Sequence, residues 1–118
     1  MVRKIAFTVY SVRDLERARR FYEEDLGLVK TADYQGGWVE YDPPGGCFAI
    51  TSYLEEVRPS ADSGGTIAFE VDDVDALTAR LQAKGVAVKV EPFSTPVCRM
   101  SIVLDPDGNA VILHRLTD

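Results

Sequence analysis

Residues 7–28, FTVYSVRDLERARRFYEEDLGL, contain a strand pattern, a helix start and a helix stop within one stretch. Residues 5–12 alternate apolar side chains with small or polar ones, as a half-buried strand does. Asp14 then stands where a helix begins, since its carboxylate can accept the first unpaired N–H groups of the helix. Apolar side chains follow at helical spacing up to Leu26, and Gly27 favours the left-handed conformation that ends a helix. The stretch therefore predicts a strand followed by an amphipathic helix.

The same pattern returns in residues 66–77, TIAFEVDDVDAL, roughly sixty residues further along the chain. Asp73 corresponds to Asp14, and Gly85 corresponds to Gly27 with one residue fewer between helix start and helix stop. Because a strand, a helix start and a helix stop recur together in the same order, the sequence predicts a duplicated module.

Three further strands are predicted after each helix, because apolar and polar side chains alternate there between turn-forming residues. The predicted strands are residues 28–34, 38–41 and 47–52 in the first copy, and 86–90, 97–104 and 110–116 in the second. Residues 91–96, which contain two prolines, are expected to form an irregular loop. Residues 105–109, DPDGN, are typical of a turn, since Asp, Gly and Asn tolerate its special dihedral angles.

The predicted fold class is α+β, with two βαβββ modules whose sheets form a curved cup. We expect a single domain over residues 1–118, with modules at 1–53 and 64–118 joined by a polar linker at 54–63. In each module the helix covers one face of the sheet and leaves the other face free. The two free faces are expected to form one concave surface, and interfaces between repeated modules are a usual place for a ligand.

The composition limits the possible functions. Of the 118 residues, 46% are hydrophobic and 27% are charged, as in a globular protein. The net charge of −6, from 13 basic and 19 acidic residues, argues against nucleic-acid binding, which needs clustered positive charge. No polybasic or long apolar stretch favours a membrane, and no secretory signal is recognised, so a cytoplasmic location is expected. The two cysteines do not suggest a disulfide framework.

The stretches at 7–28 and 66–77, together with KGV at 84–86 and DPDGN at 105–109, resemble the vicinal oxygen chelate superfamily. This superfamily includes glyoxalases, extradiol dioxygenases, fosfomycin-resistance transferases and bleomycin-resistance binding proteins. The resemblance covers nearly the whole chain and implies paired modules around a cup. It says less about function, because this fold carries several different chemistries.

The resemblance also implies a divalent metal in the cup, held by His and Glu side chains that act through it on neighbouring substrate oxygens. The corresponding positions in this chain are Phe7, Thr51, Thr66 and Ile112. None of these residues is His, Asp, Glu or Cys, and His114 is the single histidine of the chain. We therefore expect no metal and no other cofactor.

Strand alternation indicates which candidate side chains share a face of the sheet. Trp38 and Glu40 share one face, and Ile112 and His114 share another. Glu40 and His114 are the predicted acid and base, because both side chains can exchange protons when suitably placed. The predicted ligand-contacting residues are Phe7, Trp38, Thr51, Cys98, Met100 and Ile112. Structural roles stay open for the same residues, namely a hydrogen-bonded histidine, an exposed carboxylate and a tryptophan packed in the core.

Three functions are compatible with these residues. The first is a metal-free protein that binds a small, partly apolar ligand in the cup, similar to the drug-sequestering branch of the superfamily. The alternative is a glyoxalase-like lyase or isomerase that uses Glu40 and His114 as acid and base or as relocated metal ligands. The third is a non-catalytic assembly domain. A homodimer is expected in each case, because the superfamily commonly pairs and open sheet edges favour partners.

Overall fold

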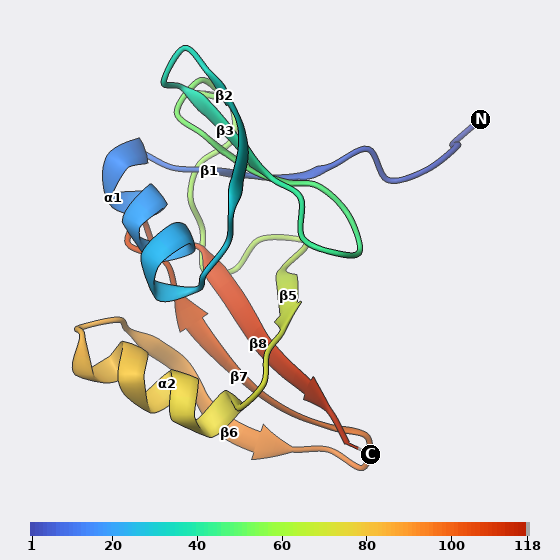
Figure 1. The fold of residues 1–118 in the computed structure, drawn as a ribbon, viewed down its shortest axis with the longest axis vertical. Coiled ribbons are helices and arrows are strands. Elements are labelled where there is room, and N and C mark those ends of the chain that lie inside the picture. Colours follow the sequence, from blue (N-terminus) through green and yellow to red (C-terminus); the bar gives the residue numbers. More distant parts are fainter. Residues whose placement is uncertain (118) are drawn as a thin grey trace. The chain divides into compact units, whose positions relative to one another are not determined.

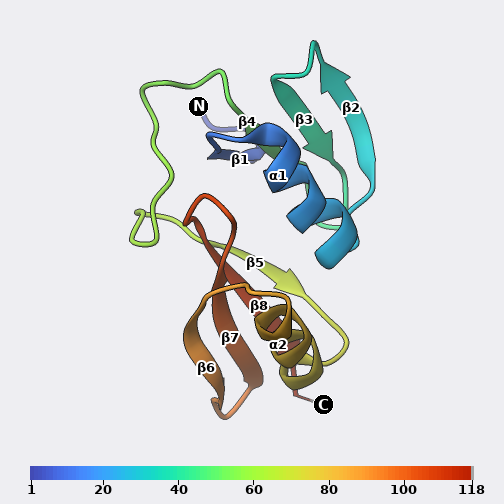
Figure 2. The same ribbon diagram turned by 90° about the vertical axis from the view of Figure 1, so that its left-hand side faces the viewer.

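The computed structural model describes residues 1–117, which form two compact units that divide between Pro59 and Ser60. This boundary lies inside the predicted linker at 54–63. Each unit contains one helical segment and one four-stranded mixed sheet (Figures 1 and 2). Within the described residues, no helix has the length and apolar character needed to cross a bilayer.

The first unit repeats the predicted βαβββ order. Its elements are β1 (Thr8–Ser11), α1 (Leu15–Arg19), the π-helical segment η1 (Arg20–Asp25), β2 (Lys30–Tyr34), β3 (Trp38–Tyr41) and β4 (Phe48–Thr51). The strands lie in the order β1-β4-β3-β2, with β1 parallel to β4 and the other neighbours antiparallel. The first strand of the module therefore lies beside the last.

The second unit has the same order and the same pairing. Its elements are β5 (Ile67–Glu70), α2 (Val74–Ala83), β6 (Val88–Ser94), β7 (Cys98–Leu104) and β8 (Ala110–Leu116). The strand order is β5-β8-β7-β6, and β5 is parallel to β8. The duplicated module and the α+β class are confirmed.

Both predicted helix starts are confirmed by their capping hydrogen bonds. The Asp14 carboxylate accepts from the backbone N–H of Arg17, and the Asp73 carboxylate accepts from that of Ala76, each at 3.0 Å. These bonds satisfy N–H groups that a helix leaves unpaired at its start. β1 begins at Thr8, later than the predicted start at residue 5.

The extra residue of the first module lies in a widened helical turn. The N–H of Leu28 donates to the Tyr22 carbonyl at 2.9 Å, whereas the equivalent N–H of Val86 donates to the Leu81 carbonyl at 3.0 Å. Tyr22 and Leu81 stand equally far from their N-caps, and both are fully buried. The π-helical turn of η1 therefore absorbs one added residue without moving the buried side chain.

Aromatic rings fill the core of the first unit. The Tyr22 ring lies 5.1 Å from the Phe48 ring, and the Tyr10 ring meets Phe48 edge-on at 5.4 Å. Such tilted and edge-on contacts add to the burial of the rings. They fix the helical segment on one face of the first sheet and leave the other face for a site.

A hydrogen-bonded network joins the helix to the rim of this core. The Tyr41 hydroxyl donates to Glu23 at 2.8 Å, and Arg19 donates to the same carboxylate at 2.7 Å. The bond from Arg19, helped by that from Tyr41, holds the pKa of Glu23 below its usual range. Burial and the nearby Glu23 carboxylate raise the pKa of Tyr41 well above its usual range.

The core of the second unit is aliphatic, with one polar contact. Its buried side chains come from one face of α2 and from the facing side of β7 and β8: Val74, Leu81, Val103, Val111 and Leu113. Within this layer the hydroxyls of Thr78 and Ser101 lie 2.8 Å apart, and Thr78 also donates to the Val74 carbonyl. The buried hydroxyls are thus hydrogen-bonded, as burial requires.

The predicted loop at 91–96 is wrong in its first four residues. β6 continues through Ser94 and remains paired with β7 at its end. The register shifts between Val90 and Phe93, on either side of Pro92. Because β6 is the edge strand of the sheet, it tolerates a residue that cannot donate a ladder hydrogen bond.

The predicted turn at 105–109 is confirmed as a hydrogen-bonded loop. Asp105 Oδ1 accepts from the backbone N–H groups of Asp107 and Asn109, each at 2.9 Å, and Asp105 Oδ2 accepts from the Asn109 side chain at 2.9 Å. Asn109 Oδ1 in turn accepts from the Ser60 N–H at 3.0 Å. These contacts explain the residue types of the loop as structural.

Candidate functional site

The pairing register of the first sheet defines its free face. The residues of β3 that alternate with Trp38 and Glu40 are fully buried, so Trp38 and Glu40 lie on the face away from the helix. Trp38 lies opposite Thr51 of β4, and Thr51 is in register with Ser11 of β1. Trp38, Thr51 and Ser11 therefore form one row across three strands.

Two contacts hold the Trp38 ring. The Phe7 ring lies 5.4 Å from the indole at an interplanar angle of 82°, which is an edge-to-face contact. The indole N–H donates to Glu40 Oε2 at 2.9 Å. Phe7 is 43% exposed, so the cluster reaches the surface. The structure thus brings together three of the predicted site residues.

Thr51 lies beside this cluster, opposite Trp38 in the neighbouring strand. Its side chain has no exposed surface. Its hydroxyl donates to the Gly37 carbonyl at 2.7 Å and accepts from the Tyr53 N–H at 2.9 Å. Because both hydrogen-bonding capacities of the hydroxyl are used inside the protein, Thr51 has a structural role in the sheet.

Tyr53 is a neighbour of this cluster that the sequence did not indicate. Its hydroxyl lies 3.2 Å from the Gln35 carbonyl, and its ring packs directly on Gly37. A Cβ atom at position 37 would overlap the ring, so glycine is needed for this close approach. The predicted Gly36-Gly37 turn therefore also serves as a seat for an aromatic ring.

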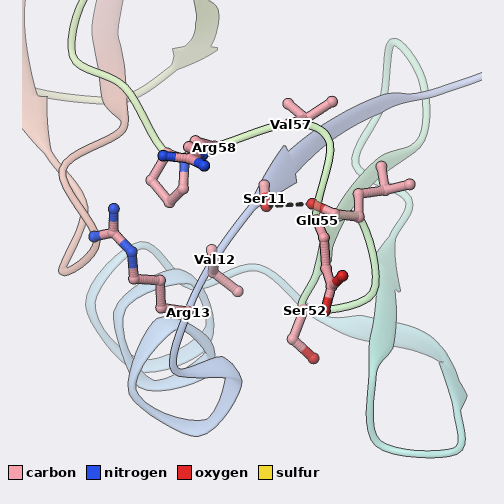
Figure 3. Close-up of a pocket in the computed structure, with 9 residues that line it drawn as sticks. Ser11, Val12, Arg13, Ser52, Glu55, Val57 and Arg58 are labelled. Atoms are coloured by element: carbon pink, nitrogen blue, oxygen red, sulfur yellow. Dashed lines mark hydrogen bonds between the residues drawn. The ribbon is translucent and has the colours of Figure 1, made fainter.

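A pocket of about 390 Å³ lies in the first unit, between the end of β1 and the chain that follows β4 (Figure 3). Its lining includes Ser11, Arg13, Ser52, Glu55 and Arg58. Ser11 Oγ donates to the Leu54 carbonyl at 3.2 Å and so ties this chain to β1. Most of this lining lies in the predicted linker at 54–63, and the pocket itself was not predicted.

The free face of the second sheet carries a histidine–carboxylate pair. His114 Nδ1 lies 2.6 Å from Glu70 Oε1, and the two residues are directly paired in the parallel strands β8 and β5. Glu70 Oε2 also accepts from the Leu116 N–H at 2.8 Å. The bond with His114, followed by that with Leu116, holds the pKa of Glu70 below its usual range. His114 is therefore a held imidazole whose Nε2 is the nitrogen left for other partners.

Three predicted ligand contacts lie on this same sheet. Met100 pairs with His114 and Ile112 pairs with Ile102, so these side chains share the face of the histidine. Cys98 is buried, and its sulfur lies 3.1 Å from the Thr95 hydroxyl. Burial and its contact with the protein thus give Cys98 a packing role.

The predicted acid and base fall in different units. Glu40 is bound to Trp38 in the first unit, and His114 is bound to Glu70 in the second. Glu70 was not among the predicted site residues. The sequence did contain a signal for Glu70, because it is a charged residue in an otherwise apolar strand. This strand, β5, pairs with β8, which carries the single histidine.

The residues at the superfamily's metal positions do not fit a metal site. The Val12 N–H donates to the Thr51 carbonyl, and the Val71 N–H donates to the His114 carbonyl, so Thr51 is the repeat equivalent of His114. Two residues earlier in each strand, Ala49 and not Thr51 is the repeat equivalent of Ile112. Neither alanine nor isoleucine can bind a metal ion, and Phe7 cannot either. Among residues 1–117, no three His, Cys, Asp or Glu side chains are grouped as ligands. The expectation of a metal-free protein stays a prediction.

Comparison with known proteins decides the family. Residues 4–113 match the Glyoxalase/Bleomycin resistance protein/Dioxygenase superfamily. The chain belongs to this superfamily. The predicted resemblance is confirmed, and with it the fold class.

Relatives in this superfamily have different activities. The crystal structure of TnmS3, an antibiotic binding protein from Streptomyces sp. CB03234, is 31% identical with a TM-score of 0.76, and the match covers 98% of each chain. The uncharacterized protein YetH of Bacillus subtilis (strain 168) is 25% identical over 96% of this chain and 98% of its own length. A probable chloroplastic lactoylglutathione lyase of Arabidopsis thaliana is 28% identical over 90% of this chain, which spans 34% of that protein. Superfamily membership alone therefore leaves a binding protein and an enzyme both open.

Proposed function

We propose that the protein binds a small molecule with a flat aromatic part, which stacks near Trp38 on the free face of the first sheet, and that it does so without a metal. The observation that carries this proposal is the held indole. Phe7 contacts the ring edge-to-face and Glu40 binds its N–H, so the ring is oriented before a ligand arrives. A preorganised ring loses little side-chain entropy on binding.

Two further observations support a binding protein. The full-length similarity to TnmS3, whose name describes antibiotic binding, favours this function over the enzymes of the superfamily. Phe7, which stands at one of the superfamily's metal positions and contacts Trp38, is apolar and suits an apolar ligand better than a metal ion.

The sole tryptophan makes the proposal directly testable. Titration with planar polycyclic compounds, beginning with anthraquinones, should quench Trp38 fluorescence in a saturable way. By calorimetry, Trp38→Leu and Phe7→Ala should each weaken binding by roughly tenfold, equivalent to one lost aromatic contact. Val29→Ala is the matched control, because Val29 is 76% exposed and lies outside the strands of the first sheet. Equal affinity in all variants would refute a site at Trp38.

The contact between His114 and Glu70 favours a second candidate, a lyase or isomerase. In this candidate His114 Nε2 moves a proton of the substrate, and Glu70 orients the imidazole ring. Screening for lactoylglutathione lyase activity is the natural first assay, given the similarity to that enzyme. His114→Ala would abolish turnover in an enzyme, whereas in a binding protein it leaves the affinity for the aromatic ligand unchanged.

We expect a homodimer for both candidate functions, the binding protein and the enzyme. Edge strands such as β2 and β6 present unpaired backbone groups that favour a partner. Light scattering coupled to size-exclusion chromatography would give twice the chain mass for a dimer, and the chain mass of 13.0 kDa for a monomer.

A further inference from the structure

The free face of the second sheet carries one continuous row of side chains across all four strands. Strand pairing gives the row as Glu70, His114, Met100 and Phe93, one residue each from β5, β8, β7 and β6. Ser101, which alternates with Met100, is buried against Thr78 of α2, so the row lies on the face away from this helix (Figure 2). Neighbouring strands lie about 4.8 Å apart, so successive side chains of the row are close neighbours.

Within this row, Glu70 determines which nitrogen of His114 carries the proton. His114 Nδ1 lies 2.6 Å from Glu70 Oε1, and the Leu116 N–H donates to Glu70 Oε2 at 2.8 Å. These two bonds hold the pKa of Glu70 below its usual range, so the group is an ionised carboxylate at neutral pH. Because an ionised carboxylate can only accept hydrogen bonds, the proton of the neutral imidazole lies on Nδ1. Nε2 is therefore a hydrogen-bond acceptor with a fixed orientation.

The surroundings of Nε2 suit a ligand that is apolar apart from one hydrogen-bond donor. The His114 side chain is 24% exposed, and no partner within residues 1–117 is hydrogen-bonded to its Nε2. Beside it lie the half-buried apolar side chains of Met100 and Ile112. A single polar group beside apolar surface fixes the orientation of a small ligand. The Met100 thioether is also a favourable partner for an aromatic ring.

We infer that the second sheet binds a phenol, whose hydroxyl donates to His114 Nε2 and whose ring lies over Met100. The phenolic hydroxyl, with a pKa of about 10, is a stronger donor than an aliphatic alcohol. Phe93, which is 38% exposed, lies two strand spacings or roughly 10 Å from His114, so a ligand of about two fused rings fits along the row. This site uses no residue of the site at Trp38, and it holds whether or not the ligand is turned over.

The single histidine allows the site to be observed directly. In the untagged chain, long-range ¹H–¹⁵N NMR spectra of imidazole groups contain the signals of His114 alone. At neutral pH we expect a protonated Nδ1 and an unprotonated Nε2 in the free protein. 2-Naphthol should shift the Nε2 signal in a saturable way. 2-Methoxynaphthalene, which has the same ring system but no hydroxyl proton, should bind roughly tenfold more weakly, the difference made by one hydrogen bond.

Variants then assign this difference to the row. Calorimetry is performed in a Trp38→Leu background, so that aromatic binding at the first sheet does not contribute. His114→Phe keeps a ring but has no acceptor nitrogen, and it should lose the preference for 2-naphthol. Glu70→Ala frees the imidazole proton to move between the two nitrogens, so it should weaken the preference and change the tautomer seen by NMR. Glu91→Ala is the matched control, because Glu91 is exposed on β6 and lies outside the row. Circular dichroism confirms that each variant is folded.

The outcomes distinguish this inference from the proposed function. A proton on Nε2 in the free protein, equal affinity for the two probes, or no binding of either probe in the Trp38→Leu background would refute the phenol site. A preference for 2-naphthol that persists in His114→Phe would refute it as well. None of these results bears on the site at Trp38, which is tested by fluorescence quenching. If 2-naphthol shifts the Nε2 signal but anthraquinones do not quench Trp38, the phenol site stands and the site at Trp38 fails.

Discussion

Replacing Gly37 with alanine tests the close contact that supports the aromatic site. A Cβ atom at this position would overlap the Tyr53 ring. The backbone at Gly37 does not otherwise require glycine, unlike that at Gly36, whose φ is 73°. Any loss of stability in Gly37→Ala therefore reports the contact with Tyr53 and not backbone strain.

Two effects of opposite sign set the expected magnitude. Alanine restricts the unfolded chain and stabilises the folded state by about 0.4–1 kcal/mol. Against this, the Tyr53 ring, which is 55% exposed, must swing outward and lose its packing and its hydroxyl contact with Gln35. Losing one hydrogen bond and part of a ring contact costs about 1–2 kcal/mol. The net change expected is a destabilisation of roughly 0.5–1 kcal/mol.

A double-mutant cycle isolates the contact. In a Tyr53→Ala background no ring opposes the new methyl group, so Gly37→Ala should instead stabilise the protein by about 0.4–1 kcal/mol. The free energy of unfolding is measured by urea titration with far-UV circular dichroism, because Trp38 fluorescence would report the local change. Gly64→Ala is the matched control: nothing lies within 4 Å of its added Cβ, and it should stabilise the chain in both backgrounds. A change of the same sign and size for Gly37→Ala in both backgrounds would refute the reasoning.

Three further predictions concern the two units. Asp105→Ala leaves three N–H donors of the 105–109 loop without their acceptor and should lower the free energy of unfolding by about 3 kcal/mol in urea titration. Asp73→Ala removes the cap of α2 and should lower it by about 1 kcal/mol, while Asp73→Asn should restore most of the loss. The lowered pKa of Glu23 stabilises the fold above the unfolded value near 4.5, and this contribution is lost as pH falls through the lowered pKa. Wild type should therefore lose its advantage over Glu23→Gln as the pH falls from neutral to below 4.5, and a constant difference would contradict the Arg19–Glu23 contact.

Local signals in the sequence were sufficient to predict the βαβββ module. Asp14 and Asp73 predicted both helix starts because a cap depends on residues within one turn of it. The comparison of the two copies revealed one extra residue in the first, but not the widened turn that holds it, since a π turn depends on where Tyr22 packs. The strand through residues 91–94 was missed because proline excludes a central strand but not an edge strand, and the sequence does not state which strand is the edge.

The residue types of the candidate site were predictable from the sequence, but the contacts between residues far apart in the sequence were not. Phe7, Trp38 and Glu40 were all candidates, and strand alternation placed Trp38 and Glu40 together. The pocket was not predictable, since it depends on the contact between Ser11 and Leu54, which lie far apart in the sequence. Glu70 was missed for a similar reason, because its link to His114 exists only through the parallel pairing of β5 with β8.

The pairing of β1 with β4 has a consequence for how the chain matures during synthesis. β1 is synthesised before the other strands of its module, but its neighbour in the sheet is the last strand of that module. Until Thr51 has been translated, the backbone of β1 has no strand to join, and its apolar side chains stay available to other chains. A pause in translation before this point would prolong that exposure, whereas a pause after Pro59 would leave the first module free to complete its sheet. All the partners of β1 in its sheet are therefore available by the time the segment between the two modules is translated.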